Sequence, residues 1–170
     1  HYALQHLQRT DRISITTFSD RAHIHLPSTW ALDKSYALEK ISQIEARGST
    51  ALHAGWVEGA MQVSRYFQVF GINRVILCSD GLANIGETNP DTLAMMLYGL
   101  AKRGISTIPV GIGENCNEDL LRAIAHSQSV QYHSIQDSTN FPHLFESLLT
   151  ELLHPIATDI RLNIKPQTGV

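Results

Sequence analysis

Short apolar runs that alternate with longer, helix-like segments are the feature that most constrains how this chain folds. The run Val75–Cys78 is short and bounded by polar residues, as in a strand buried on both faces, and Ile105–Ile112 has the same character. Between them, Asn89-Pro90 gives a helix a clean start, because Asn caps a helix and Pro needs no amide in the first turn. This alternation predicts an α/β fold: a doubly wound, Rossmann-like and mostly parallel sheet with helices on both faces.

The first part of the chain is expected to add a hairpin. Residues 12–18 are rich in β-branched side chains, and residues 22–26 alternate His23 and His25 with apolar residues. Only Ser19-Asp20-Arg21 separates the two segments, so the second is expected to be an antiparallel edge strand. Further helices are expected over residues 35–46, with Asp33 available as a cap, over 52–70, after a cap at Asn117, and over 141–153. Strands are expected over 130–135 and 160–164.

Small residues mark one face of the helix expected over residues 52–70. Ala51, Gly55 and Gly59 recur every four residues, and glycine costs a helix stability, so the stripe predicts close packing on a sheet. Trp30 and Trp56 are interpreted as packing residues.

Composition limits the classes of partner. Lys plus Arg number 13 against 16 Asp plus Glu, a net charge of −3, and no basic patch suits a nucleic acid or an anionic membrane. No apolar run approaches the roughly 20 residues of a membrane helix. The sequence does not establish a location; a cytoplasmic one is expected, and a targeting signal upstream of His1 stays open. Cys78 is interpreted as a buried thiol, although a bridge to Cys116 stays open.

Two oxygen-bearing side chains fall where a metal could bind. Asp80 follows a buried strand, and Thr50 lies in Gly48–Leu52, before a helix. Sites in such folds lie beyond the carboxyl ends of the strands, and hard oxygen ligands suit Mg²⁺. Each has a purely structural alternative: Thr50 as a helix N-cap, and Asp80 as the first residue of an Asp-Gly turn.

Four segments in order resemble the von Willebrand factor type A family. Residues 11–20 resemble its second strand, 48–52 the loop with the metal-site threonine, 75–81 the strand and loop with the metal-site aspartate, and 108–113 the next strand. The resemblance covers residues 1–154 and is closest to bacterial stand-alone members.

This resemblance implies a metal-ion-dependent adhesion site. In the family, an Asp-x-Ser-x-Ser loop, a Thr and an Asp hold a divalent cation, usually Mg²⁺, which captures an Asp or Glu side chain of a partner protein. Thr50 and Asp80 match the last two ligands. The first motif is absent: Asp33–Ala37 lacks its final Ser and follows no buried strand. The resemblance therefore implies a protein-binding module rather than an enzyme, with Mg²⁺ expected in the complete domain and weak or absent in this chain.

The missing loop also indicates how the domain is organised. Residues 1–154 are expected to form a domain that lacks the family's first, central strand and its loop, and residues 155–170 to start a following β-rich segment. Losing a central strand would expose strand edges and leave a groove, so either an upstream segment or another chain is expected to fill it.

Other signals are weaker. His23 and His25 share a strand face but are too few for a metal site, and His53 is interpreted as a plain helix residue. Gly111-Ile112-Gly113 lacks the third glycine of a dinucleotide fingerprint, and residues 114–119 are interpreted as a solvated loop with a helix cap. No phosphate loop or nucleophile elbow occurs.

Two other functions stay open. One is a metal-independent scaffold that docks through the Ala22–Leu26 edge or through the strand expected after Pro155. The other is a non-catalytic subunit of an ATPase-driven metal-insertion or remodelling complex.

Overall fold

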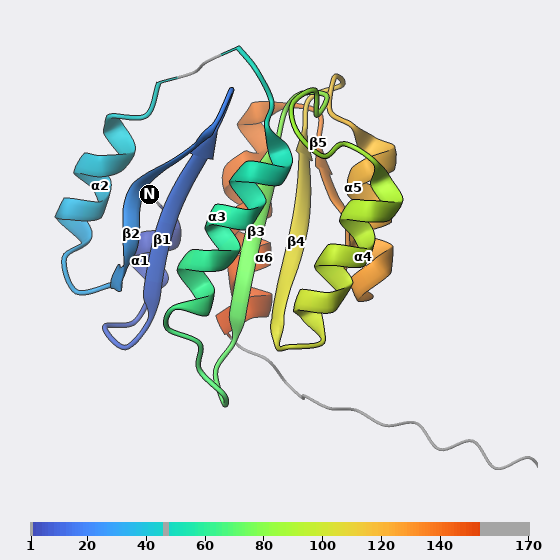
Figure 1. Cartoon of the computed structure of the whole chain (residues 1–170). Helices are drawn as coiled ribbons and strands as arrows, with labels where there is room; N and C mark the ends of the chain where they lie inside the picture. Colours follow the sequence, from blue (N-terminus) through green and yellow to red (C-terminus); the bar gives the residue numbers. More distant parts are fainter. Residues whose placement is uncertain (1, 46–47, 154–170) are drawn as a thin grey trace, which may run out of the picture.

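The computed structural model describes residues 2–45 and 48–153 (Figure 1). The order of elements confirms the predicted α/β alternation, whereas the strand expected over residues 160–164 lies outside the described residues. The elements are α1 (Tyr2–His6), β1 (Arg12–Phe18), β2 (Ala22–Trp30), α2 (Lys34–Ser42), α3 (Leu52–Ser64), β3 (Asn73–Ser79), α4 (Pro90–Ala101), β4 (Ile105–Ile112), α5 (Glu118–Gln128), β5 (His133–Ile135), a 3₁₀ turn (Ser138–Asn140) and α6 (Phe141–Leu153).

The strands of the described residues form two sheets. β3, β4 and β5 are parallel neighbours in that order, as the apolar runs predicted. β1 and β2 form the predicted antiparallel hairpin, with Phe18 opposite Ala22 next to the turn and Arg12 opposite Trp30 at the far end. Within the described chain, β1 has no ladder with β3, although the two strands stand side by side in Figure 1.

Helices cover both faces of this arrangement. On one face, α3, α4 and α5 share a core in which Leu52, Leu93 and Leu121 are fully buried. On the other, Leu148 of α6 packs with Val110 of β4. A third core lies among α1, β2 and α2. Phe18 of β1 packs against the first core, so α3 is shared by the hairpin and β3–β5. None of the helices in the described part of the chain has the length and apolar character needed to cross a membrane.

Local capping signals were predicted correctly. Asn89, Asn117 and Asp33 each accept a hydrogen bond from the backbone amide three residues on, at 3.0, 3.2 and 2.9 Å. These side chains satisfy amides that the first turn of a helix leaves without a partner. Asp33 is therefore a helix cap, in agreement with its rejection as a metal ligand.

Three element boundaries were predicted wrongly. α3 ends at Ser64 rather than at Phe70, because the Asn73 side chain bonds the backbone amide and carbonyl of Gln68 and holds a turn there. The helix over residues 35–46 is shorter, Lys34–Ser42, and β5 starts at His133 rather than at residue 130.

The structure also shows how far the edge strand extends and where the two tryptophans pack. β2 runs through Pro27 to Trp30, which an edge strand tolerates because Pro removes only one ladder donor. Trp56 is buried and donates to Thr107 Oγ1 at 3.0 Å, as a packing residue should. Trp30 is instead 45% exposed and packs against the Arg12 guanidinium at the surface, 4.5 Å from the centre of its ring.

Candidate metal-binding rim

Three loops meet at the carboxyl ends of β1 and β3. The Ala51 amide donates to the Ser19 carbonyl at 2.7 Å, which ties the start of α3 to the end of β1. The Thr50 amide donates to Asn84 Oδ1 at 3.0 Å, and the Asn84 amide donates to the Thr50 carbonyl at 3.2 Å. The ends of both strands are thus fastened to one short segment, which makes a rim at this end of the molecule.

The Thr50 hydroxyl lies directly over the residue that follows Asp80. A Cβ built on Gly81 would stand 2.9 Å from Thr50 Oγ1, closer than real Cβ atoms come to a neighbour. Glycine at position 81 therefore allows the Thr50 loop to approach the end of β3. As a result Thr50, which is half-buried, and Asp80, which is exposed, belong to the same rim.

The helix-cap alternative for Thr50 is wrong. The N-cap of α3 is Ala51, and no side chain caps this helix start. The turn at Asp80 is held by its neighbour, because Ser79 Oγ donates to the Gly81 carbonyl at 3.2 Å. The Asp80 carboxylate is therefore directed by a fixed turn and remains exposed to solvent.

The two predicted residues at this rim carry oxygen donors of the types that a magnesium site uses. A hydroxyl and a carboxylate are the oxygen donors that Mg²⁺ prefers, so the chemistry of the two residues fits the ion. In the ranges that the structure describes, however, no group of three or more His, Cys, Asp or Glu side chains is placed to hold a metal. The donor set therefore fits in type and is incomplete in number.

Two rim residues escaped the sequence analysis. Asn84 joins the two loops, and its signal was only that of a polar residue shortly after a strand. Asp20 is an exposed carboxylate just beyond β1, and the Ser19 hydroxyl, which donates to it at 2.9 Å, lowers the pKa of this group. Asn84 follows no spacing rule, because its role depends on a contact with Thr50, 34 positions away in the sequence.

Among residues 2–45 and 48–153, the histidines do not gather into a metal site. His25 Nε2 lies 2.8 Å from Thr17 Oγ1, and the His23 and His25 rings meet edge-on with their centres 4.5 Å apart. His53 stacks obliquely near Trp56 on α3, with 6.1 Å between ring centres. These contacts agree with the interpretation of the histidines as polar-face and helix residues.

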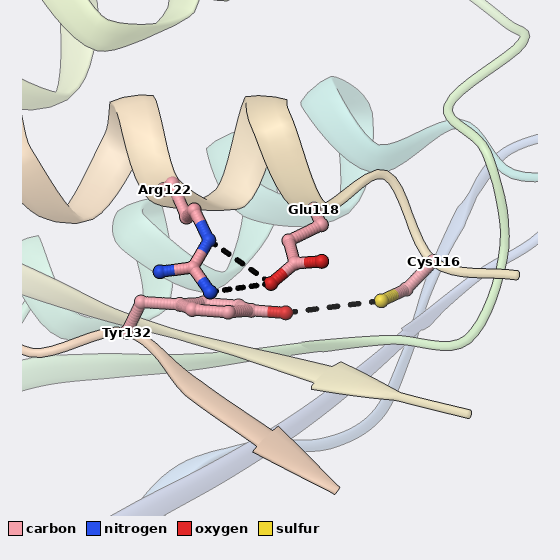
Figure 2. Close-up of polar contacts among 4 residues, drawn as sticks. All are labelled: Cys116, Glu118, Arg122 and Tyr132. Atoms are coloured by element: carbon pink, nitrogen blue, oxygen red, sulfur yellow. Dashed lines mark hydrogen bonds and ion pairs between the residues drawn. The ribbon is translucent and has the colours of Figure 1, made fainter. Parts of the chain in front are cut away.

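The acidic segment 114–119 is organised by its own contacts (Figure 2). Glu118 forms an ion pair with Arg122 one turn along α5, and the Arg122 guanidinium lies 4.8 Å from the centre of the Tyr132 ring. The Tyr132 hydroxyl lies 3.8 Å from Cys116 Sγ, and burial is the main cause that raises the pKa of Tyr132. The segment is thus a helix start with a solvent-facing ion pair.

Both cysteines are free thiols, so the bridge that stayed open in the sequence is not formed. Burial raises the pKa of the Cys78 thiol to about 12. Cys78 is therefore protonated at neutral pH and is a poor metal ligand, since the thiolate is the binding form.

Comparison with known proteins identifies the class that this fold and rim define. The family model of the von Willebrand factor type A domain matches residues 3–147. The chain therefore belongs to the von Willebrand factor type A family. Domains of this family generally act as protein-interaction modules, and some carry a metal-ion-dependent adhesion site.

Two similar proteins show what share of a relative this chain spans and how closely its fold matches a solved structure. The uncharacterized protein YfbK of Escherichia coli (strain K12) is 28% identical over 163 residues, which are 95% of this chain and 28% of that protein. The chain thus spans little more than a quarter of this relative. A von Willebrand factor type A structure from Catenulispora acidiphila has a TM-score of 0.77 at 18% identity, covering 89% of this chain and 36% of the other.

A third comparison concerns a metal-bound structure. Proximal thread matrix protein 1 from the mussel byssus, with a zinc-occupied adhesion-site motif, has a TM-score of 0.61 at 16% identity. The alignment covers 89% of this chain and 38% of the mussel protein, and at this identity the likeness concerns the fold alone.

Proposed function

We propose that this domain is a non-catalytic protein-binding module that, in its complete form, captures an acidic side chain of a partner through Mg²⁺. The ligands contributed by this chain would be Thr50 and Asp80. The observation that carries the proposal is the approach of the Thr50 hydroxyl to Gly81, beside Asp80, at the carboxyl ends of the strands. The exposure of Asp80 leaves this rim open to a partner.

The chemistry of the two residues supports capture of an anion. A hydroxyl ligand is neutral and a single carboxylate carries one negative charge, so together they leave a divalent cation with net positive charge. Bound Mg²⁺ would supply that charge at an open position facing an Asp or Glu of the partner. Thr50 and Asp80 orient the site because the hydrogen bonds to Asn84 and the turn at Ser79 fix their loops.

The metal-bound mussel structure supports the same proposal. That structure has a zinc-occupied adhesion-site motif and shares the fold of this chain. A divalent cation at the corresponding rim is therefore a reasonable expectation for the complete domain. With two protein ligands, this chain by itself is expected to hold Mg²⁺ poorly, because water would fill most of the coordination shell.

Calorimetric titration with Mg²⁺ tests the proposal. We expect no micromolar binding to residues 1–170, and binding once an Asp-x-Ser-x-Ser loop completes the domain. In that complete domain, Asp80→Asn and Thr50→Val should each weaken Mg²⁺ binding by about tenfold or more, as loss of one ligand does. The matched control is Asp11→Asn, at the opposite end of β1. Micromolar binding by the 170-residue chain, or equal binding by Asp80→Asn and Asp11→Asn, would contradict the proposal.

Partner binding with and without a chelator separates this function from the metal-independent scaffold. The exposed edge of β2, which is paired on one side in the described sheet, favours that second candidate. If EDTA abolishes partner binding by the complete domain, the metal-dependent function holds. If binding survives EDTA and is lost when the β2 edge is blocked, for example by Ile24→Pro, the scaffold function replaces it.

A further inference from the structure

The loop between α3 and β3, residues 65–72, carries large apolar side chains into solvent. Phe70 is fully exposed, Val69 is 75% exposed and Ile72 is 49% exposed. In Figure 1 this loop forms the turn at the lower end of the molecule and projects below the neighbouring turns. Apolar side chains gathered on one exposed surface mark an interaction site, whereas single ones need no explanation.

The turn at the tip of this loop does not need apolar residues. The Gly71 amide donates to the Gln68 carbonyl at 3.1 Å, which closes a four-residue turn with Val69 and Phe70 at its centre. Polar residues, Gly and Pro normally fill such positions. The buried Asn73 side chain donates to the carbonyls of Gln68 and Gly71 at 2.7 and 3.1 Å and accepts from the Gln68 amide at 2.9 Å. These backbone groups are thus paired within the protein, which lowers the cost of placing the tip in an apolar phase.

Aromatic contacts hold the loop against segments on both sides. Tyr66 packs on the Arg12 guanidinium, which lies 3.6 Å from the centre of its ring, and Trp30 contacts the same guanidinium at 4.5 Å. On the other side, a Cβ on Gly104 would stand 2.9 Å from Phe67 Cζ, so the turn after α4 lies directly against the loop. Exposed Trp and Tyr rings suit a boundary between water and an apolar phase, because they combine an apolar body with a polar atom.

Four cationic side chains surround this loop at the amino ends of the strands. Arg65 lies at its start, Arg12 at one flank, and Lys102 and Arg103 in the adjoining turn. Arg65, Lys102 and Arg103 are exposed. Among residues 2–45 and 48–153, no carboxylate forms an ion pair with any of the four. Their charge is therefore available to an anionic partner.

The two ends of the molecule differ in charge. The rim at the carboxyl ends of the strands carries exposed carboxylates, among them Asp20, Asp80 and Glu114. At the amino ends, Asp11 and Asp33 each accept a backbone amide beside the cationic side chains. The net charge of −3 conceals this separation, because the cationic residues lie far apart in the sequence, which alone indicated no basic patch. An anionic surface would attract the amino ends and repel the rim.

We propose that this end of the molecule docks on an anionic lipid bilayer, with Val69 and Phe70 among the acyl chains and Arg65, Lys102 and Arg103 at the head-group phosphates. A protruding loop suits a bilayer better than a protein, because a specific protein interface buries about 800 Å² on each partner, whereas an amphipathic segment enters a bilayer by only about 5–10 Å. In this orientation the rim faces away from the bilayer. The docking requires no metal and stands independently of the proposed function.

Sedimentation with vesicles measures the docking, in EDTA so that no metal contributes. The chain is mixed with phosphatidylcholine vesicles that contain either no anionic lipid or about one-third phosphatidylglycerol. Binding to the anionic vesicles should be at least about tenfold stronger, since each cation near such a surface strengthens binding about fivefold. Raising the ionic strength from about 0.1 to about 1 M should release the chain, because the screening length falls from about 10 to about 3 Å. Equal binding to both kinds of vesicle, or binding to neither, would overturn the proposal.

A matched pair of apolar variants tests the inserted residue. Phe70→Ser should weaken binding to the anionic vesicles by about tenfold or more, because a large apolar side chain is lost from the acyl region. The fully exposed side chain has no packing to lose, so the variant should fold. Leu82→Ser is the control, since Leu82 is 62% exposed in the loop after β3, at the opposite end. Equal binding by the two variants would place the docking elsewhere and overturn the proposal.

A second pair tests the charge. Arg103→Gln should weaken binding to the anionic vesicles about fivefold and leave binding to the neutral vesicles unchanged. Arg21→Gln removes an exposed cation from the rim and should change neither. If Arg21→Gln weakens binding as much as Arg103→Gln does, the charge acts without regard to position and the proposed orientation is wrong.

Insertion has a spectroscopic signature of its own. The emission of Phe70→Trp should move to shorter wavelength with anionic vesicles, beyond any change from Trp30 and Trp56 in the unsubstituted chain. Leu82→Trp should show no such shift. An unshifted emission of bound Phe70→Trp would overturn insertion of the loop. If instead the chain dimerises without lipid and Phe70→Ser abolishes the dimer, the loop belongs to a contact with a second copy and the lipid assignment is wrong.

Discussion

The two sheets differ in how far their strands are buried, although the chain builds both from similar residues. In β4, which has neighbours on both edges, six of eight residues are buried. In β1, which pairs on one edge, all seven residues are only half-buried. Strands of comparable composition thus reach different burial because of what stands beside them. The difference teaches that the burial of a strand depends on its neighbours: among the described residues β1 is paired on one edge and β4 on both.

The largest expected effect contrasts one isoleucine in each half. Ile108 on β4 is 5% exposed, whereas Ile15 on β1 is half-buried. Ile108→Ala should lower the free energy of unfolding by about 2–5 kcal/mol, the usual cost of a large-to-small change in a core. Ile15→Ala in the same chain should cost about 1 kcal/mol, since less apolar surface is lost. Urea unfolding measures both, and equal losses would break the comparison.

The next expected effect concerns Cys78, which lies on β3, where the β3–β5 sheet faces the hairpin of β1 and β2. Its pKa is raised from 9.0 to about 12 by burial, so the unfolded chain releases this proton at a lower pH than the folded chain does. The raised pKa of Cys78 therefore contributes to the free energy of unfolding. This contribution is fully present below pH 9 and is lost as pH rises from about 9 to 12, by at most about 1.4 kcal/mol per pH unit. Unfolding free energies between pH 8 and 11 check this, with Cys78→Ala as the control. An equal slope in the control would show that Cys78 is not the titrating group.

Removing the hydroxyl of Thr16 and removing that of its neighbour Thr17 on β1 should change stability by smaller amounts and in opposite directions. Thr16→Val removes a buried hydroxyl that lacks a partner and should stabilise the 170-residue chain by about 1 kcal/mol. Thr17→Val removes a hydroxyl 2.8 Å from His25 Nε2 and should destabilise it by a similar amount. Thermal unfolding of the pair sharpens the comparison. A loss of stability in Thr16→Val would mean that this hydroxyl is satisfied and that β1 is not missing a neighbour.

The smallest expected effect tests the hydrogen bond between Thr50 and Asn84, which links the loop before α3 to the loop after β3 at the rim. Asn84→Ala removes the acceptor of the Thr50 amide and should cost about 0.5–1 kcal/mol, since the bond is exposed. It should also speed the hydrogen exchange of the Thr50 amide. Asn115→Ala, on another exposed loop, is the control and should change neither quantity. If the two variants behave alike, the rim does not hold the sheets together.

Much of the fold was readable from particular residues. The apolar runs located β3 and predicted β4 to the residue, and Asn89, Asn117 and Asp33 marked helix starts, because burial and capping depend on residues close in sequence. The candidate site was readable in part: Thr50 and Asp80 were selected, but Asn84 was not. Its role arises from a contact across 34 positions of the chain, which no local pattern encodes.

By itself, the sequence determined the class of the fold, the hairpin and the two oxygen-bearing side chains at the rim, since periodicity, turn residues and side-chain chemistry are local properties. Only the tertiary structure decided that the strands form two sheets, that Trp30 stacks outside the core, and that the Thr50 hydroxyl rests on Gly81. These depend on which distant segments become neighbours. A side chain can be buried, paired or left without a partner only once those neighbours are in place.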